Sequence, residues 1–398
     1  MLMDKNATNS SYMKLSNRRL ILNIVRKKPA SRAELAKMTG LTRAAVTLIV
    51  EELIKDGILM ETGTAEADYG RKPVLLDLEP HNNYAVGVSV ARDGCNVGLM
   101  NIKGVLLDKH QVTIDGAMDA YEIIAAIIEK INKIMADSSL PAEKFLGIGI
   151  NTPGPVDIKD GRVLNPPNFD LWHNVNIVTE FKKSFPFNVF LENNATALAL
   201  AEKNYGRGAE FGSFMLMVVD AGIGAGIVIN DRIYRGVGGF GSEVGHTSID
   251  INGKACSCGN RGCLEVYASI PSALKKIQGQ GKNIKTWDEL VDKASDGDGS
   301  CMELIGNEAL YLSAGIVNAM NILELEAVIL TGTIQYRPEL LLELIRKNVE
   351  NTAITRHIHK LQIMDSSILK DSEIISAAAV VFEKYFNGEA AIGPLNQA

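Results

Sequence analysis

The chain has 398 residues, a length that predicts two or three domains. Hydrophobic residues make up 46% of it and charged residues 22%, which is typical of a soluble globular protein. The longest apolar stretch, residues 214–229, is broken by Asp220 and contains three glycines, so a membrane span is not expected. Residues 1–11 are polar and lack an apolar signal core, and we therefore expect a cytoplasmic protein.

The charge is unevenly distributed along the chain. Residues 1–50 hold ten Lys and Arg but only two acids, Asp4 and Glu34, which gives them a net charge of +8. Because the whole chain carries −6, the remaining residues carry −14. A basic end on an acidic body indicates that a polyanion binds at one end only. Charge alone does not distinguish this from a solvated basic helix face.

Three helices are predicted in the basic segment. Apolar residues within Asn17–Lys28 follow the spacing of one helix face, and Pro29 ends that helix. Ser31 and Glu34 form a capping box that begins a short second helix, which ends at Gly40. Thr42 is a suitable N-cap for a third helix. Two helices joined by a tight turn at a glycine predict a helix-turn-helix.

Polar residues near the start of the third helix lie off its apolar stripe, where they could reach base edges in a major groove. Two short strands, Ile58–Glu61 and Val74–Leu78, follow, and the basic connection between them suits a wing along a phosphate backbone or minor groove. A three-helix packing module without DNA contact is the alternative. The candidate DNA contacts are Ser31, Arg32, Thr42, Arg43, Ala44, Thr47, Arg71 and Lys72, within a module of residues 1–80.

Residues 81–398 predict an α/β domain made of two similar halves. Strands at residues 84–90, 96–101 and 105–112 resemble a β-meander and precede a helix at 121–135. A related pattern recurs at residues 214–219, 226–230 and 233–234. This repetition predicts two lobes with a ligand cleft between them. We place the first lobe at about 81–195 with the C-terminal helix, and the second at about 196–375.

A histidine and three cysteines fall within eighteen residues, as His246-x9-Cys256-x-Cys258-x4-Cys263. One imidazole and three thiols match a closed, tetrahedral structural zinc site, with one ion per chain. The alternative is a group of free thiols near a core histidine. Cys95 and Cys301 have no such neighbours and are expected to be buried apolar side chains.

Several segments, in order, resemble the ROK (repressor, open reading frame, kinase) family, and within it the repressors of xylose operons. They are the turn at residues 31–41, the wing residues 70–73, and the segments 151–157, 167–168, 192–195 and 241–246, followed by the cysteine cluster. The resemblance covers nearly the whole chain. It implies the actin-like, two-lobed sugar-kinase fold behind the N-terminal winged helix-turn-helix, and zinc at the four positions above.

The resemblance also implies a sugar site. A buried sugar needs a hydrogen-bonding group for each hydroxyl, and carboxylates, amides and an imidazole can supply them. His246 would bind zinc through one ring nitrogen and the sugar through the other. For each residue taken singly, the alternative is an ordinary capping or surface polar group. The candidate sugar ligands are Asn168, Asn193, Asn194, Glu243, His246 and Glu265.

Departures from the family's kinases argue against catalysis, and we expect no catalytic residue. Asn194 stands where those kinases have the aspartate that acts as general base, and an amide cannot take that proton. The first phosphate loop aligns with residues 89–93, which contain no glycine and end in Asp93. The second loop begins with Asp220 instead of glycine, and the glycine pair on the adenine side is reduced to Thr331-Gly332.

The sequence therefore predicts a homodimeric or homotetrameric repressor of a sugar-utilisation operon. Two copies of the basic module would bind the half-sites of an operator palindrome. The resemblance favours xylose as the monosaccharide effector. Xylose in its pyranose form also lacks the C6 hydroxymethyl group that these kinases phosphorylate. Two alternatives remain, a sugar kinase with a DNA-binding head and a regulator whose large domain binds a protein partner.

Overall fold

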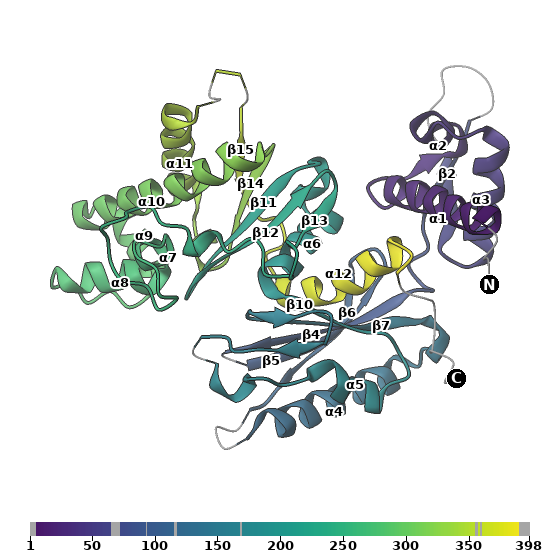
Figure 1. The fold of residues 1–398 in the computed structure, drawn as a ribbon, viewed down its shortest axis with the longest axis horizontal. Helices are drawn as coiled ribbons and strands as arrows, with labels where there is room; N and C mark the ends of the chain where they lie inside the picture. Colours follow the sequence, from purple (N-terminus) through teal and green to yellow (C-terminus); the bar gives the residue numbers. More distant parts are fainter. Residues whose placement is uncertain are drawn as a thin grey trace. The chain divides into compact units, whose positions relative to one another are not determined.

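The computed structural model describes residues 5–64, 72–92, 94–114, 118–167, 169–354, 357–358 and 360–389. Asp4, Arg71, Asp93 and Asn168, which were named above, lie outside these ranges. The chain divides into two compact units, one of residues 1–194 with 371–398 and one of residues 195–370. Figure 1 shows the elements of each unit.

The N-terminal module in the first unit is a winged helix-turn-helix. Its described residues form three helices, α1 (Lys5–Val25), α2 (Arg32–Thr39) and α3 (Arg43–Lys55). A three-stranded sheet in the order β1-β3-β2 joins β1 (Ala30–Ser31), β2 (Leu59–Thr64) and β3 (Val74–Leu78). The predicted helices and both wing strands are therefore confirmed. The first helix begins earlier than predicted, because the polar residues before Asn17 include no glycine or proline to stop it.

Local caps explain the boundaries of these helices. The Glu34 N–H donates to Ser31 Oγ at 3.3 Å and the Ser31 N–H donates to Glu34 Oε2 at 2.8 Å, which is a complete capping box. Gly40 has φ of 72°, the left-handed conformation that ends α2. The Ala45 N–H donates to Thr42 Oγ1 at 3.2 Å and begins α3. The tight turn is thus determined by local sequence.

The first unit also contains a five-stranded sheet in the order β10-β7-β4-β5-β6. Its strands are β4 (Tyr84–Ala91), β5 (Gly94–Asn101), β6 (Leu106–Val112), β7 (Phe145–Thr152) and β10 (Val189–Asn193). Helices α4 (Ala120–Ser138) and α5 (Ile177–Ser184) cover one face, and α12 (Ser372–Phe386) covers the other (Figure 1). A short hairpin joins β8 (Val156–Asp157) and β9 (Arg162–Val163).

Glycines in neighbouring strands bring α12 close to this sheet. A Cβ atom on Gly87 of β4 would lie 2.3 Å from the Ile374 carbonyl oxygen. One on Gly149 of β7 would lie 1.9 Å from the Ala377 carbonyl oxygen. Backbone therefore packs directly on backbone, and any side chain at these two positions would push the helix away.

The second unit has a sheet of the same design, in the order β13-β12-β11-β14-β15. Its strands are β11 (Phe214–Val219), β12 (Ile223–Ile229), β13 (Arg232–Tyr234), β14 (Ala327–Thr331) and β15 (Gln362–Asp365). In both sheets an antiparallel meander is extended by two parallel strands. This common topology confirms the predicted repetition of an α/β fold.

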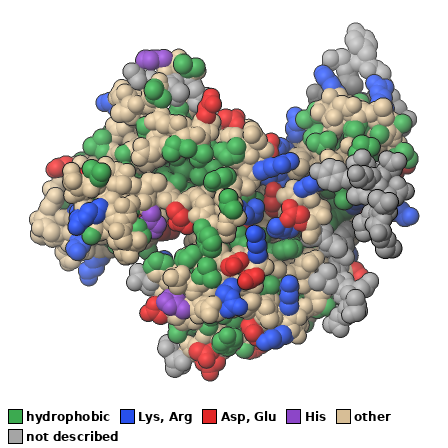
Figure 2. Space-filling view, in the orientation of Figure 1, with side chains coloured by type: hydrophobic (Ala, Val, Ile, Leu, Met, Phe, Trp, Pro, Cys, Tyr) green, Lys and Arg blue, Asp and Glu red, His purple; other side chains and the backbone are tan. Residues whose placement is uncertain are grey.

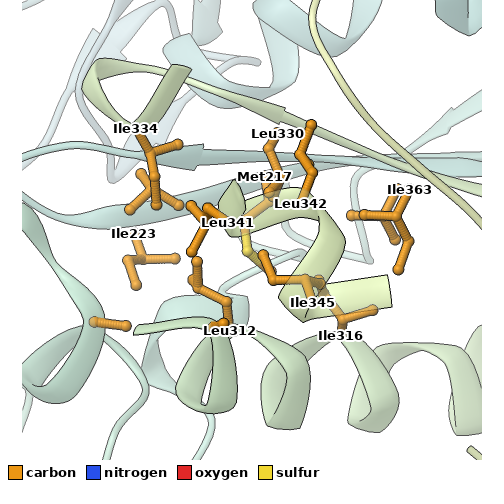
Figure 3. Packing of buried hydrophobic residues seen from close by; sticks show 14 of the residues in the cluster. Met217, Ile223, Leu312, Ile316, Leu330, Ile334, Leu341, Leu342, Ile345 and Ile363 are labelled. Carbon is orange, nitrogen blue, oxygen red and sulfur yellow. The ribbon is translucent and has the colours of Figure 1, made fainter. Parts of the chain in front are cut away.

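The part of the second unit that the structure describes has six α-helices: α6 (Asn194–Tyr205), α7 (Glu265–Ala268), α8 (Ile270–Gly279), α9 (Trp287–Ser295), α10 (Gly299–Leu323) and α11 (Glu339–Thr352). Side chains from β11, β12, α10 and α11 pack together in the main core of this unit. Figure 3 shows part of this packing, including Met217, Leu312 and Ile345. On the other face α6 packs on Gly226, where a Cβ would lie 2.4 Å from the Ala195 oxygen. No helix in the described ranges is long and apolar enough to cross a membrane.

Candidate functional site

The start of α3 presents the predicted DNA contacts to solvent. Thr42, Arg43 and Ala44 are exposed and Thr47 is half-buried, whereas the residues of the apolar stripe of α3 are buried in the module. Leu48, on the same outer face, is 63% exposed and was not predicted from the sequence. An exposed helix start above a buried stripe is the arrangement in which a recognition helix can enter a major groove.

The other described DNA candidates differ in their surroundings. Ser31 is buried and its hydroxyl belongs to the capping box of α2. Arg32 is ion-paired, with its Nη1 at 2.9 Å from Glu61 Oε1 on β2. Lys72 is exposed just before β3. The space-filling view shows Lys and Arg side chains on the drawn face of the N-terminal module (Figure 2).

The predicted metal ligands lie together in the second unit. His246 ends a 3-10 turn of residues 244–246, and its Nδ1 lies 3.6 Å from Cys256 Sγ. Cys258 Sγ lies 3.7 Å from Cys263 Sγ, and all four ligand atoms fall within 4.8 Å of one another. Tetrahedral ligands at about 2.3 Å from a zinc ion are about 3.7 Å apart. The cluster could therefore hold a metal ion of this size.

Backbone conformation brings the three sulfur atoms together. Gly259 and Gly262 have φ of 92° and 69°, which favour glycine. A Cβ on Gly262 would lie 1.8 Å from the Asp250 carbonyl oxygen, so any side chain at this position would force the backbone to shift. The Cys256 N–H donates to the Asn260 carbonyl at 2.9 Å and closes the loop.

The thiols differ in their ease of ionisation. Burial and the two neighbouring thiols raise the pKa of Cys263 to about 12. The Asn260 backbone N–H lowers the pKa of exposed Cys258. Three thiolates at this spacing repel one another, so a bound cation is what would allow them to ionise together.

Three of the predicted sugar ligands also lie in the second unit, next to this cluster. Glu265 begins α7, and its Oε2 accepts the Ile223 N–H at 2.9 Å. A Cβ on Gly222 would lie 2.6 Å from the same oxygen, so the glycine-rich turn makes room for this carboxylate. Burial raises the pKa of Glu243, and neighbouring Glu265 raises it further, whereas His246 lowers it. The carboxylates of Glu243 and Glu265 and the imidazole of His246 thus form a cluster of polar side chains.

Two asparagines that were predicted to bind the sugar, Asn193 and Asn194, lie at the end of a strand in the sheet of the first unit. Asn193 ends β10, beside Thr152 of β7, and Asn194 begins α6. A Cβ on Gly154 would lie 2.5 Å from Asn193 Nδ2. Sequence reasoning missed the role of Asn151, whose Nδ2 donates to the Glu373 carbonyl at 2.7 Å and to Ser376 Oγ at 2.8 Å. Asn151 therefore holds the first turn of α12.

The segments that the family resemblance aligns with phosphate loops make hydrogen bonds to other parts of the chain. The Thr333 N–H donates to Asp220 Oδ1 at 2.9 Å, and the Thr333 hydroxyl also donates to that oxygen. In the first unit, Arg92 donates to the Pro167 carbonyl from Nη2 at 2.9 Å and from Nε at 3.3 Å. Asp220 and Arg92 are thus both engaged in hydrogen bonds within the chain.

A winged helix-turn-helix module followed by two sheets of one topology defines a DNA-binding protein with a sugar-kinase fold. The chain belongs to the ROK family, whose model matches residues 85–384. A model described as winged helix-turn-helix DNA-binding matches residues 15–60.

The relatives of this chain include proteins named as repressors and proteins named as sugar kinases. A xylose repressor of Bacillus spizizenii is 31% identical over 95% of this chain and 97% of its own length. A glucokinase of Thermotoga maritima is 29% identical over 75% of this chain and 97% of its own. The solved structure of a ROK family transcriptional regulator, a homologue of the Escherichia coli MLC protein, superposes with a TM-score of 0.79 at 26% identity, covering 94% and 97% of the two chains.

Proposed function

We propose that the protein is a transcriptional repressor of a carbohydrate-utilisation operon whose effector is a monosaccharide, namely xylose. One observation carries the proposal. Polar groups suited to a sugar, Glu243, His246 and Glu265, lie together, while Asp220 binds Thr333 in the loop that a nucleotide would need. Similarity to a xylose repressor over 95% of the chain supports the choice of sugar.

The sugar ligands have defined chemical roles in this proposal. Glu265 is oriented by the Ile223 N–H and keeps a second oxygen for a hydroxyl proton. His246 has Nδ1 on the side of Cys256, so Nε2 is the nitrogen for the sugar. The asparagines Asn193 and Asn194, with Asn168, are the proposed ligands from the first unit. Amides both donate and accept, which matches hydroxyl groups.

We assign zinc to the cluster of His246, Cys256, Cys258 and Cys263. Three soft thiolates and an imidazole select zinc among the common divalent cations, and four protein ligands leave no open position for catalysis. Bound zinc would supply the cross-link that holds residues 246–263 in one conformation. That conformation in turn fixes His246 and the chain leading to Glu265.

We propose that the protein does not transfer a phosphoryl group to the sugar. Asn194 has no useful basicity near neutral pH, so it cannot take a proton from a sugar hydroxyl. The Asp220 carboxylate accepts both donors of Thr333 and adds a negative charge where a phosphate would lie. A sugar can therefore bind without being consumed, as an effector must.

Operator DNA is the proposed partner of residues 1–80. Thr42, Arg43, Ala44 and Thr47 would face base edges, and Arg32, Arg71 and Lys72 would bind phosphates. Ser31 would act through the capping box that fixes the start of α2. Two copies of the chain, in a dimer or tetramer, would occupy two half-sites. Residues 81–398 form the proposed sugar-binding domain.

A binding experiment with its own operator region tests the proposal. Fluorescence anisotropy would measure the Kd for DNA from upstream of the operon, alone and with millimolar xylose, glucose or N-acetylglucosamine. We expect nanomolar binding and a change of at least fivefold in Kd with xylose, in line with typical couplings of about 5- to 150-fold. An unchanged Kd with every sugar would refute the effector. ADP formation from ATP and a sugar in a coupled assay would refute the exclusion of kinase activity.

A further inference from the structure

A buried ion pair joins the N-terminal module to the C-terminal helix. Arg26 directly follows α1, and its Nη1 lies 3.0 Å from Glu383 Oε2 on the last turn of α12. The two side chains are only 4% and 8% exposed. The Arg26 guanidinium also lies over the Phe386 ring, 5.4 Å from its centroid. A buried charge pair of this kind tolerates little displacement, because either charge alone would be costly to bury.

Other side chains of the same turn pack against the module. Tyr385 is buried, and burial together with the nearby Asp56 carboxylate raises its pKa while Arg18 lowers it. Arg18 Nη2 and Asp56 Oδ2 are 2.8 Å apart within the module. A Cβ on Gly388 would lie 3.4 Å from a methyl group of Leu15. The last turn of α12 and the residue Gly388 after it therefore lie against the N-terminal module.

The connection between module and sheet forms a second attachment. Asn83, which is buried, donates from Nδ2 to the Gly57 carbonyl at 2.8 Å. Lys103 Nζ, on the turn after β5, lies 2.6 Å from Asp77 Oδ2 on β3. Two attachments at different points define an orientation, whereas a single one would allow the module to swivel.

The opposite end of α12 lies where the chain enters the first unit. The second unit ends at Lys370, and the chain returns to the first unit at Asp371. Asp371 has φ of 53°, and Lys109 Nζ lies 2.6 Å from its Oδ1. Asn151, at the carboxyl end of β7, donates to the Glu373 carbonyl and to Ser376. One helix thus extends from the unit boundary and the end of β7 to the DNA-binding module.

Building on the function proposed above, we propose that Arg26 and Glu383 are positioning residues. They fix the module to α12, so that a sugar-dependent change at the first turn of α12 alters operator affinity. The pair touches neither DNA nor sugar in this proposal. Its removal should therefore uncouple the two binding events and leave each of them intact. A merely structural pair would change stability or both affinities instead.

Three variants of the full-length protein test this inference. Arg26→Gln and Glu383→Gln each remove one charge, and the double variant Arg26→Glu/Glu383→Arg reverses both. Lys384→Gln is the matched control, because Lys384 is the next residue on α12 and pairs with Glu389 at 2.6 Å on the surface. Anisotropy gives the operator Kd with and without 10 mM xylose, and calorimetry gives the xylose Kd without DNA.

For both single variants we expect the ratio of operator Kd values with and without xylose to fall below about twofold. Their xylose Kd should stay within about twofold of wild type. The charge reversal should restore at least half of the wild-type effect on a logarithmic scale, and Lys384→Gln should keep it all. If circular dichroism shows that a single variant fails to fold, the double variant Arg26→Met/Glu383→Met removes both charges together. A ratio of its operator Kd values with and without xylose below about twofold then supports the inference.

The inference is overturned if folded Arg26→Gln, Glu383→Gln or the double methionine variant keeps the wild-type ratio. It is also overturned if these variants lose xylose binding itself, since the pair would then act on the sugar site. Failure of the proposed function has a different signature, because wild-type protein would then show no change of operator Kd with any sugar.

Discussion

The loop of residues 246–263, which carries the proposed zinc ligands, contains two glycines that can be compared. Their substitution tests how the backbone of this loop positions the cysteines. Both Gly259 and Gly262 have positive φ, at 92° and 69°. Nothing lies within 4 Å of a Cβ placed on Gly259, whereas a Cβ on Gly262 would lie 1.8 Å from the Asp250 carbonyl oxygen. Alanine at the two positions therefore introduces the same kind of backbone strain but a very different steric contact.

The difference between the two variants can be worked out from these contacts. An L-residue in the left-handed region costs about 1–2 kcal/mol, which applies to Gly259→Ala and Gly262→Ala alike. Overpacking adds about 1–3 kcal/mol at Gly262, because the Asp250 carbonyl belongs to the backbone and must shift. Gly262→Ala should thus be less stable by about 2–5 kcal/mol and Gly259→Ala by about 1–2 kcal/mol. Since Cys263 follows Gly262, the shift should also displace one sulfur ligand.

Metal affinity and thermal unfolding measure this directly. Competition with a chromophoric chelator gives the zinc affinity of each full-length variant, and differential scanning fluorimetry with and without zinc gives the stabilisation by the metal. We expect Gly259→Ala to hold zinc within about threefold of wild type and Gly262→Ala to lose at least tenfold, the equivalent of about 1.4 kcal/mol. Equal affinities for the two variants would refute the argument that the contact with Asp250 shapes the site.

Three further predictions concern the sugar, the operator and the first unit. Glu265→Gln should weaken xylose binding by about 1.5–3 kcal/mol in calorimetry, because a charged acceptor is lost, while Glu326→Gln, at another carboxylate that accepts a backbone N–H, should not. Arg43→Ala should reduce operator affinity by about 1–3 kcal/mol in anisotropy, without changing the xylose Kd. Gly149→Ala should lower the stability of the first unit by about 1–3 kcal/mol in urea unfolding, since its Cβ meets a carbonyl of α12, whereas Gly279→Ala meets nothing.

Local sequence predicted those features that depend on neighbouring residues. The helix-turn-helix follows from the caps at Ser31 and Thr42 and from the turn at Gly40, each of which acts within four residues. The candidate metal ligands lie within eighteen residues, so His246 and Cys263 could be grouped from their spacing in the sequence. The strands of both meanders were recognisable as short, mostly apolar segments joined by turns, and the first strand of each meander is buried on both faces.

Contacts between distant segments could not be predicted in the same way. Arg26 and Glu383 are 357 residues apart, and each is an ordinary charged residue in its own helix or turn. Asn151 lies in one of the segments that carry the family resemblance, but the resemblance did not indicate that its amide binds α12. One signal was available, because glycines at Gly87 and Gly149 in buried strands indicate that another backbone approaches. Sequence did not reveal which backbone it was.

Asp220 shows why a residue that departs from a family pattern must also be considered for the contact that it makes. From sequence, its carboxylate replaces a glycine and only subtracts a phosphate-binding turn. In the structure the same carboxylate accepts both the N–H and the hydroxyl of Thr333, so it ties the turn after β11 to the turn after β14. Two donors that could face an anion are thus already paired, and the second unit gains a contact between two of its loops. Replacement of Asp220 by glycine would therefore remove this contact between two loops of the second unit as well as a negative charge.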